Sequence, residues 1–190
     1  MPFLEHVGAL YPAIARVAGA RVVVDSSKDA SYGYVAAALP TVDLSVVHLV
    51  RDPRAVAYSL CERRTFDPGS GQVLGGHSTA RAIVGWSGTN AFAQGLGAPD
   101  RRCLVRYERF AEDPDEAVAA IRMLAGDAGA PSPPRDVPVL THQVAGNPLR
   151  FDRQPAPIRR DDAWRTEMTT RRRVAVTAGT WPFLLAYGRR

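Results

Sequence analysis

Arg51 and Ser59 are the two residues whose types and spacing best suit the binding of a phosphate-like anion. The apolar run before Arg51 is too short for a helix and rich in β-branched residues, which is typical of a buried strand in a parallel sheet. A helix is expected to follow at once, because Asp52 is a good N-cap and Pro53 suits the first helical position. Arg51 would thus lie at the carboxyl end of a strand, where α/β sheets place their ligands. A guanidinium fork and a hydroxyl beside one helix start can hold a single anionic group.

A second polar turn, DSSKD at residues 25–29, follows a short β-branched strand expected over residues 21–24. Ser26, Ser27 and Lys28 can hydrogen-bond an anion, with the exposed N–H groups of a helix expected over residues 30–39 behind them. Lys28 is the one lysine among the 24 basic residues, which favours a site that needs a compact ammonium rather than a guanidinium fork. Successive parallel strands would bring both turns to the same edge of the sheet.

Both turns also have a purely structural interpretation. Arg51 could pair with Asp52 or with a helix end, and the Ser59 hydroxyl could bond a backbone carbonyl. The DSSKD turn could be an ordinary Ser/Asp helix cap. These alternatives stay open at the level of the sequence.

The rest of the chain predicts the elements that would position these residues. Apolar residues at helical spacing predict a helix over residues 3–18, and Ser78 can cap another that runs to about residue 96. A third strand is expected over residues 102–107 and a further helix from Asp113 to Ala125. The glycine-rich stretch at residues 65–77 lacks periodicity and predicts a loop. With 190 residues, the chain suits one domain.

Composition narrows the class of protein. Hydrophobic residues make up 46% and charged residues 23% of the chain, as in ordinary globular proteins, and the net charge of +5 favours an anionic ligand. Cys61 and Cys103 have no metal-ligand spacing and suggest reduced thiols, so we expect a cytoplasmic protein without a metal site. We find no signal peptide and no membrane span, so no membrane partner is expected.

Several segments resemble the family of sulfotransferases that use 3′-phosphoadenylyl sulfate (PAPS), of the bacterial and carbohydrate type. VRDPRAVAYS, which contains Arg51 and Ser59, is similar to the 3′-phosphate-binding segment of that family. The matching segments run in the family's order along the chain: DSSK, VRDPRAVAYS, RYERFAEDP, GNPLRF and the tail from DAW to AYG. The resemblance implies one sulfotransferase-like domain over residues 1–190, corresponding to the later two-thirds of a usual member.

The fold implied by the resemblance is α/β, a three-layer P-loop-NTPase-like parallel sheet flanked by helices. Family members begin with a strand and a PRSGT-type loop that holds the 5′-phosphosulfate. We find no such segment in this sequence, so we expect a domain truncated at its N-terminus. In several relatives a glutamate after that loop is the general base. Its position would lie in the segment that we do not find here, so the resemblance supplies no base. His48, within an apolar run, is expected to be a core histidine.

The resemblance also implies roles for individual residues in binding PAPS, with no metal. Arg51 and Ser59 would hold the 3′-phosphate, and Tyr107 would border the adenine. Asn147 and Arg150 would lie in a late loop that folds back over the nucleotide, where Arg150 could reach a phosphate.

The activity implied is in-line transfer of a sulfuryl group from PAPS to a hydroxyl or amine of a small-molecule or carbohydrate acceptor. Lys28, with Ser26 and Ser27, would neutralise charge near the bridging oxygen. The alternative is a non-catalytic nucleotide-binding or interaction module derived from a sulfotransferase. A basic nucleic-acid-binding protein is a third interpretation. The sequence lacks a basic stripe interleaved with aromatic residues, so no nucleic-acid partner is expected.

Overall fold

The structure of this chain is a computed structural model, which describes residues 2–62, 64–67, 72–74, 76–127 and 160–188. In these ranges it is an α/β structure, mostly helical, with a small parallel sheet of two strands. Strand β1 (Val46–Val50) pairs with β4 (Arg102–Arg106), and the register aligns Val50 with Arg106. The strands predicted before Arg51 and at residues 102–107 are confirmed, as is their parallel direction.

The strand predicted over residues 21–24 is wrong. Residues 22–29 form no regular secondary structure, and the side chains of Val22 and Val24 are 45% and 85% exposed. A β-branched run favours extended backbone, but a strand also needs a hydrogen-bonded neighbour, and no strand among the described residues pairs with this segment. The DSSKD turn is therefore not the end of a sheet strand.

Helices pack against the sheet, and four of them begin at a residue whose side chain caps the first turn. The side chains of Asp29, Asp52, Ser78 and Asp113 each accept a hydrogen bond from a backbone N–H in the first turn of the helix that follows. The helices are α1 (Pro2–Ala18), α2 (Ala30–Ala37), α3 (Pro53–Cys61), α4 (Thr79–Gly95), α5 (Tyr107–Glu112), α6 (Pro114–Leu124), α7 (Trp164–Glu167) and α8 (Thr170–Gly188), with a 3₁₀ turn at Pro99–Arg101.

A short antiparallel hairpin replaces part of the loop predicted at residues 65–77. It consists of β2 (Arg64–Asp67) and β3 (Gln72–Leu74), which pair with an irregular register. Glycine-rich composition indicated a loop because it carries no alternating apolar pattern from which a strand could be predicted.

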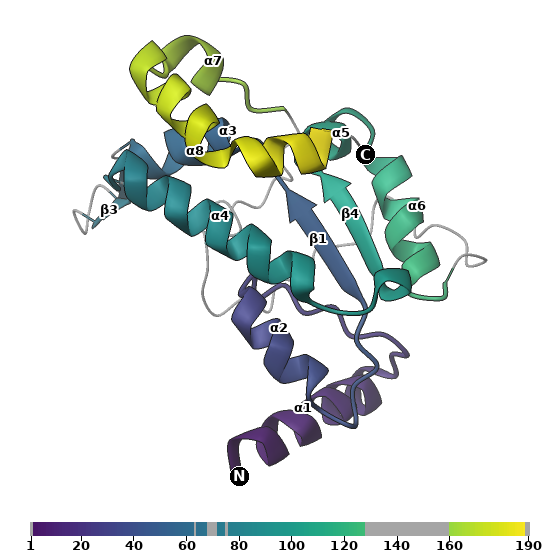
Figure 1. The fold of residues 1–190 in the computed structure, drawn as a ribbon. Helices are drawn as coiled ribbons and strands as arrows, with labels where there is room; N and C mark the ends of the chain where they lie inside the picture. The colour runs from purple at the N-terminus through teal and green to yellow at the C-terminus, as the bar shows by residue number, and fades with distance from the viewer. Residues whose placement is uncertain (1, 63, 68–71, 75, 128–159, 189–190) are drawn as a thin grey trace.

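The core lies between the sheet and the helices α3, α4 and α8. Figure 1 shows α4 and α8 crossing the same side of the two strands, with α6 beside β4. Val50 of β1, Trp86 of α4 and Tyr187 of α8 form one buried cluster. A second cluster joins α3 to the last third of the chain through Tyr58, Trp164 and other side chains: Ala55, Ala57, Cys61, Ala82, Met168 and Val176.

His48 is buried in this core, as predicted. Its Nε2 lies 3.0 Å from Oδ1 of Asn90 in α4, and its ring meets that of Tyr187 edge to face. Burial lowers the pKa of His48 below its usual value, and the hydrogen bond with Asn90 offsets part of that effect. The histidine is therefore a neutral structural group of the core.

Helices α1 and α2 pack at the end of the sheet where the strands begin. A Cβ atom at Gly33 of α2 would meet the side chain of Leu96 at the end of α4, and one at Gly97 would meet that of Val46 at the start of β1. Thr41 bonds the carbonyl of Gly8 in α1. No helix in the described ranges combines the length and the apolar character that crossing a membrane requires.

Candidate functional site

The carboxyl ends of β1 and β4 bring Arg51 and Tyr107 together. Each residue directly follows its strand, and the parallel register aligns the two strand ends. The guanidinium carbon of Arg51 lies 4.7 Å from the centre of the Tyr107 ring, which is a cation–π contact. Two residues predicted to bind one nucleotide are thus neighbours, although the chain separates them by more than fifty positions.

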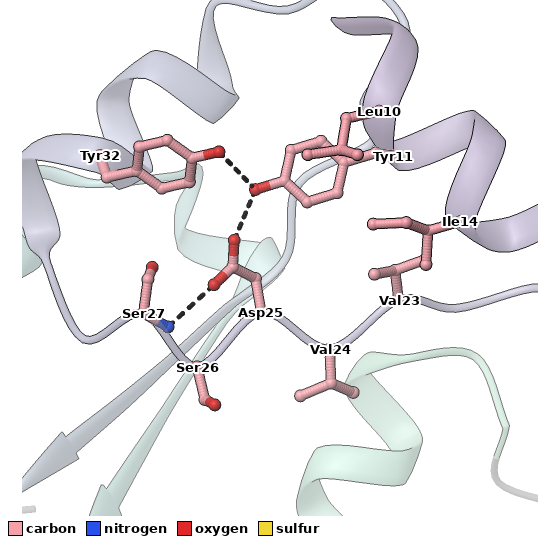
Figure 2. Close-up of a pocket in the computed structure, with 9 residues that line it drawn as sticks. All are labelled: Leu10, Tyr11, Ile14, Val23, Val24, Asp25, Ser26, Ser27 and Tyr32. Carbon is pink, nitrogen blue, oxygen red and sulfur yellow. Dashed lines mark hydrogen bonds between the residues drawn. The ribbon is translucent and has the colours of Figure 1, made fainter. Parts of the chain in front are cut away.

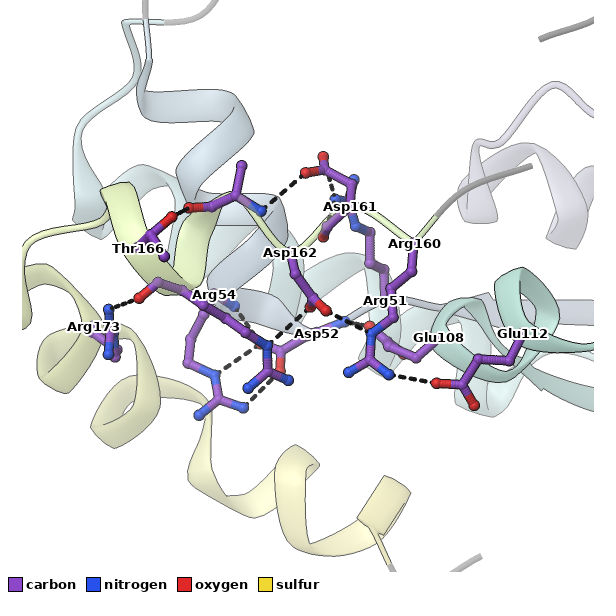
Figure 3. Close-up of polar contacts among 12 residues, drawn as sticks. Arg51, Asp52, Arg54, Glu108, Glu112, Arg160, Asp161, Asp162, Thr166 and Arg173 are labelled. Atoms are coloured by element: carbon purple, nitrogen blue, oxygen red, sulfur yellow. Dashed lines mark hydrogen bonds and ion pairs between the residues drawn. The ribbon is translucent and has the colours of Figure 1, made fainter. Parts of the chain in front are cut away.

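A carboxylate holds the guanidinium of Arg51. Its Nη2 donates to Oδ2 of Asp161 at 2.8 Å and to the carbonyl of Asp161 at 3.5 Å (Figure 3). The Arg51 side chain is 25% exposed and that of Asp161 is 45% exposed. The Nε atom of Arg51 is buried and donates to no acceptor in the described part of the chain. The alternative that Arg51 pairs with Asp52 is wrong, and the carboxylate partner of Arg51 lies instead just before the start of α7.

Asp52 is committed to Arg54 and to the helix start. Its Oδ1 accepts from the backbone N–H of Arg54 at 2.8 Å, and its two oxygens accept from Nε and Nη2 of that residue at 2.9 and 2.6 Å. This hydrogen bonding raises the pKa of Arg54 above its usual value. The backbone N–H of Asp52 donates to Oε1 of Glu108 at 2.9 Å, which ties α5 to the start of α3.

Three arginines contact the ring of Trp164. The sequence pattern assigns this residue no role beyond its place in the DAW segment. The guanidinium carbons of Arg54, Arg165 and Arg173 lie 4.6, 4.9 and 5.7 Å from the centre of its ring. Trp164 itself is buried. Arg173 also donates to the carbonyl of Arg165 at 2.6 Å. The contact of Arg54 joins α3 to α7, and that of Arg173 joins α8 to α7.

Ser59 lies in the last turn of α3 and is exposed. Its hydroxyl has no hydrogen-bond partner within the ranges that the structure describes. The alternative that it bonds a backbone carbonyl is therefore wrong. Arg51 precedes the N-terminus of the same helix, and the structure shows no contact between the two side chains.

Ser26 and Ser27 line an open pocket of about 370 Å³ between α1 and the segment that leads to α2 (Figure 2). One wall is aliphatic and the other is polar. The aliphatic lining residues are Leu10, Ile14, Val23 and Val24, and the polar ones are Tyr11, Asp25, Ser26, Ser27 and Tyr32.

Asp25 is the charged group of this pocket. Its Oδ2 accepts from the Tyr11 hydroxyl at 2.5 Å, and its Oδ1 accepts from the backbone N–H of Ser27 at 2.8 Å. The hydrogen bond from Tyr11 lowers the pKa of Asp25, whereas burial raises that of Tyr11. The Tyr11 hydroxyl also lies 3.2 Å from that of Tyr32. The lining residues include a carboxylate and no cation, so this pocket suits an alcohol or amine rather than an anion.

Lys28 is exposed and does not line the pocket. Its backbone φ of 67° is unusual for a residue with a side chain, and it is the one non-glycine residue with positive φ in the described chain. The prediction that the two polar turns share one sheet edge depended on a strand at residues 21–24, and that premise is wrong. Ser26 to Lys28 belong to the segment between α1 and α2, whereas Arg51 belongs to the end of the sheet.

Asn147 and Arg150 lie outside the described residues, so their predicted roles remain predictions. No group of three or more acidic, histidine or cysteine side chains in the described ranges could hold a metal ion. No protein-family model, no curated protein and no solved structure matches this chain.

Proposed function

We propose that this chain binds a nucleotide through a phosphate on Arg51, and that it transfers a sulfuryl group from PAPS to a hydroxyl or amine of a small-molecule or carbohydrate acceptor. The observation that carries the proposal is the geometry at the end of the sheet. A guanidinium already engaged by an anionic group lies 4.7 Å from an aromatic ring supplied by the neighbouring strand. A guanidinium can bind a phosphate through two hydrogen bonds, and an aromatic ring beside it can stack against a nucleobase.

The remaining nucleotide contacts follow the resemblance of the sequence to sulfotransferases. Ser59 supplies an exposed hydroxyl on α3, whose start Arg51 precedes. Tyr107 borders the adenine, and the roles that the resemblance implies for Asn147 and Arg150 belong to residues outside the described ranges. We propose the three-layer P-loop-like arrangement as the wider fold, supported by parallel strands with α4 and α8 on one side and α6 beside β4.

The acceptor belongs in the pocket next to Ser26 and Ser27. Its volume of about 370 Å³ is within the range of small-molecule sites. The aliphatic wall fits the body of an acceptor, and the Asp25 carboxylate can accept a hydrogen bond from its hydroxyl or amine. The low pKa of Asp25 keeps it charged and makes it an orienting group rather than a strong base.

The chemistry is a single displacement at sulfur. The acceptor oxygen or nitrogen forms a bond to sulfur, while the bond between sulfur and the bridging phosphate oxygen breaks. The electron pair of the broken bond stays on that oxygen, and the resemblance to sulfotransferases assigns the ammonium of Lys28 to offset the developing charge. The acceptor proton passes to solvent water, which reaches the open pocket. Like phosphoryl transfer, the reaction depends chiefly on positioning and on charge stabilisation.

A non-catalytic nucleotide-binding module is the second candidate. The observation that favours it is the separation of the two polar groups. Lys28 lies in the segment between α1 and α2, whereas Arg51 contacts Tyr107 and Asp161 at the end of the sheet. Such a module would bind nucleotide without completing a transfer.

Transfer of labelled sulfate from PAPS to a panel of alcohols, amines and carbohydrates tests the activity. A sulfotransferase gives labelled acceptor and releases adenosine 3′,5′-bisphosphate in equal amounts, and added adenosine 3′,5′-bisphosphate inhibits it. Nucleotide binding without labelled product across the panel would support the non-catalytic module instead.

A further inference from the structure

Some of the N–H donors of the Arg51 guanidinium have an acceptor, and one has none within the described ranges. Nη2 bonds the carboxylate of Asp161 at 2.8 Å, and one face lies over the Tyr107 ring. Nε is buried without an acceptor among the residues described. A guanidinium binds a carboxylate or phosphate best when two of its N–H groups donate in parallel. The contact with Asp161 therefore leaves part of the fork's donor capacity unused.

The neighbouring carboxylates have other cations or donors. Asp52 receives the fork of Arg54, and Glu108 receives the backbone N–H of Asp52. Asp162 pairs with Arg160 at 2.9 Å. Asp161 is thus the carboxylate that pairs with Arg51, and it lies in the short segment that precedes α7.

We propose that Asp161 is a built-in competitor whose carboxylate takes the position of the ligand's phosphate on Arg51. This inference depends on the proposed nucleotide binding at Arg51. The pair lies at the surface, with side chains 25% and 45% exposed, and exposed ion pairs are weak and readily separated. A phosphate group brings a second negative charge and further oxygens, which can accept from the terminal nitrogens of the guanidinium. It therefore displaces the carboxylate, and the affinity for nucleotide is lowered by the free energy of the displaced pair.

Asp161→Asn tests competition against the opposite role, in which Asp161 holds Arg51 in place for the ligand. Asparagine removes the charge but keeps the side-chain oxygen that accepts the backbone N–H of Ala163 at 3.3 Å. Competition predicts that Asp161→Asn binds adenosine 3′,5′-bisphosphate about fivefold more tightly in isothermal titration, as expected for loss of an exposed ion pair. A positioning role predicts weaker binding.

Asp127→Asn is the matched control. Asp127 also pairs with an arginine, Arg122, and its side chain is 42% exposed, so the variant changes the net charge by the same amount away from Arg51. Its affinity should equal that of the unmodified chain. In an Arg51→Gln background, Asp161→Asn should give no gain.

The outcomes separate the two proposals. Equal or weaker binding by Asp161→Asn, with clear binding by the unmodified chain, overturns the competitor and leaves nucleotide binding intact. A gain that persists in the Arg51→Gln background also overturns it, because the effect would then be general electrostatics. No binding by any variant overturns the proposed function, and the competitor with it.

Discussion

Lys28 has a backbone conformation that its side chain disfavours. Its φ of 67° lies in the left-handed region, where a Cβ atom crowds the following carbonyl. Such strain persists only where the surroundings fix the backbone, and it is frequent at functional sites. Glycine would adopt the same conformation without this crowding.

We expect Lys28→Gly to raise the free energy of unfolding by about 0.5–1 kcal/mol in urea denaturation, because relief of the crowding exceeds the cost of the greater freedom of glycine in the unfolded chain. Ser27→Gly is the control, because Ser27 is the preceding exposed residue and is not among the positive-φ positions. That variant should lose about 0.5–1 kcal/mol through the greater freedom of the unfolded chain. A less stable Lys28→Gly variant would show that the lysine side chain itself stabilises the turn.

His48 makes stability depend on pH in a defined direction. Burial lowers its pKa in the folded state. As the pH falls below the unfolded value of about 6.5, the unfolded chain takes up a proton that the folded core resists. The stabilisation from neutral His48 is therefore present above about pH 6.5 and is lost below it.

We expect the free energy of unfolding to fall between about pH 7 and pH 5, and to fall less steeply in His48→Gln. Urea denaturation across this range measures both slopes. Carboxylates such as Asp25 contribute equally to the two proteins, so the difference between the slopes isolates the histidine. Parallel slopes would contradict the account of a buried neutral imidazole.

The ends of the strands and the starts of the helices determine where the side chains of the candidate site lie. Arg51 and Asp52 are adjacent but have different partners, because Asp52 turns into the helix start and binds Arg54 while Arg51 remains at the sheet. Asp52 thus both caps α3 and, through its N–H, links α3 to α5.

Asp52→Ala should destabilise the protein by about 2 kcal/mol, at the upper end of the range for helix caps, because it also removes the ion pair with Arg54. Asp113→Ala is the comparison, since Asp113 caps α6 through one hydrogen bond to the N–H of Glu116. It should cost about 1 kcal/mol. Equal losses in thermal or urea unfolding would mean that the Arg54 pair adds nothing to the cap.

Sequence patterns predicted the local features well. The caps Asp52, Ser78 and Asp113 and the two paired strands follow from side-chain hydrogen bonding and from short apolar runs, which act over a few residues. The strand at residues 21–24 could not be decided locally, because extended backbone becomes a strand only when a neighbour pairs with it. The contact between Arg51 and Asp161 joins residues 110 positions apart, and no local pattern encodes it.

Across the described parts of the chain, packing between helices supplies most of the buried core. One face of β1 is buried at His48 and Val50 under α4 and α8, whereas Val47 and Leu49 on the other face are 42% and 56% exposed. Parallel sheets usually bury both faces. The described sheet therefore positions Arg51 and Tyr107 at its end, while the clusters among α3, α4 and α8 supply most of the core.

Isothermal titration with adenosine 3′,5′-bisphosphate is the sharpest test of whether Arg51 holds the phosphate of a nucleotide. Arg51→Gln should weaken binding at least about tenfold, as expected for loss of a charged hydrogen-bond donor, and Ser59→Ala by about fivefold. Arg122→Gln is the control, because Arg122 is an arginine of similar exposure, 20%, that pairs with Asp127. It should bind as the unmodified chain does. Unchanged binding by Arg51→Gln would contradict the claim.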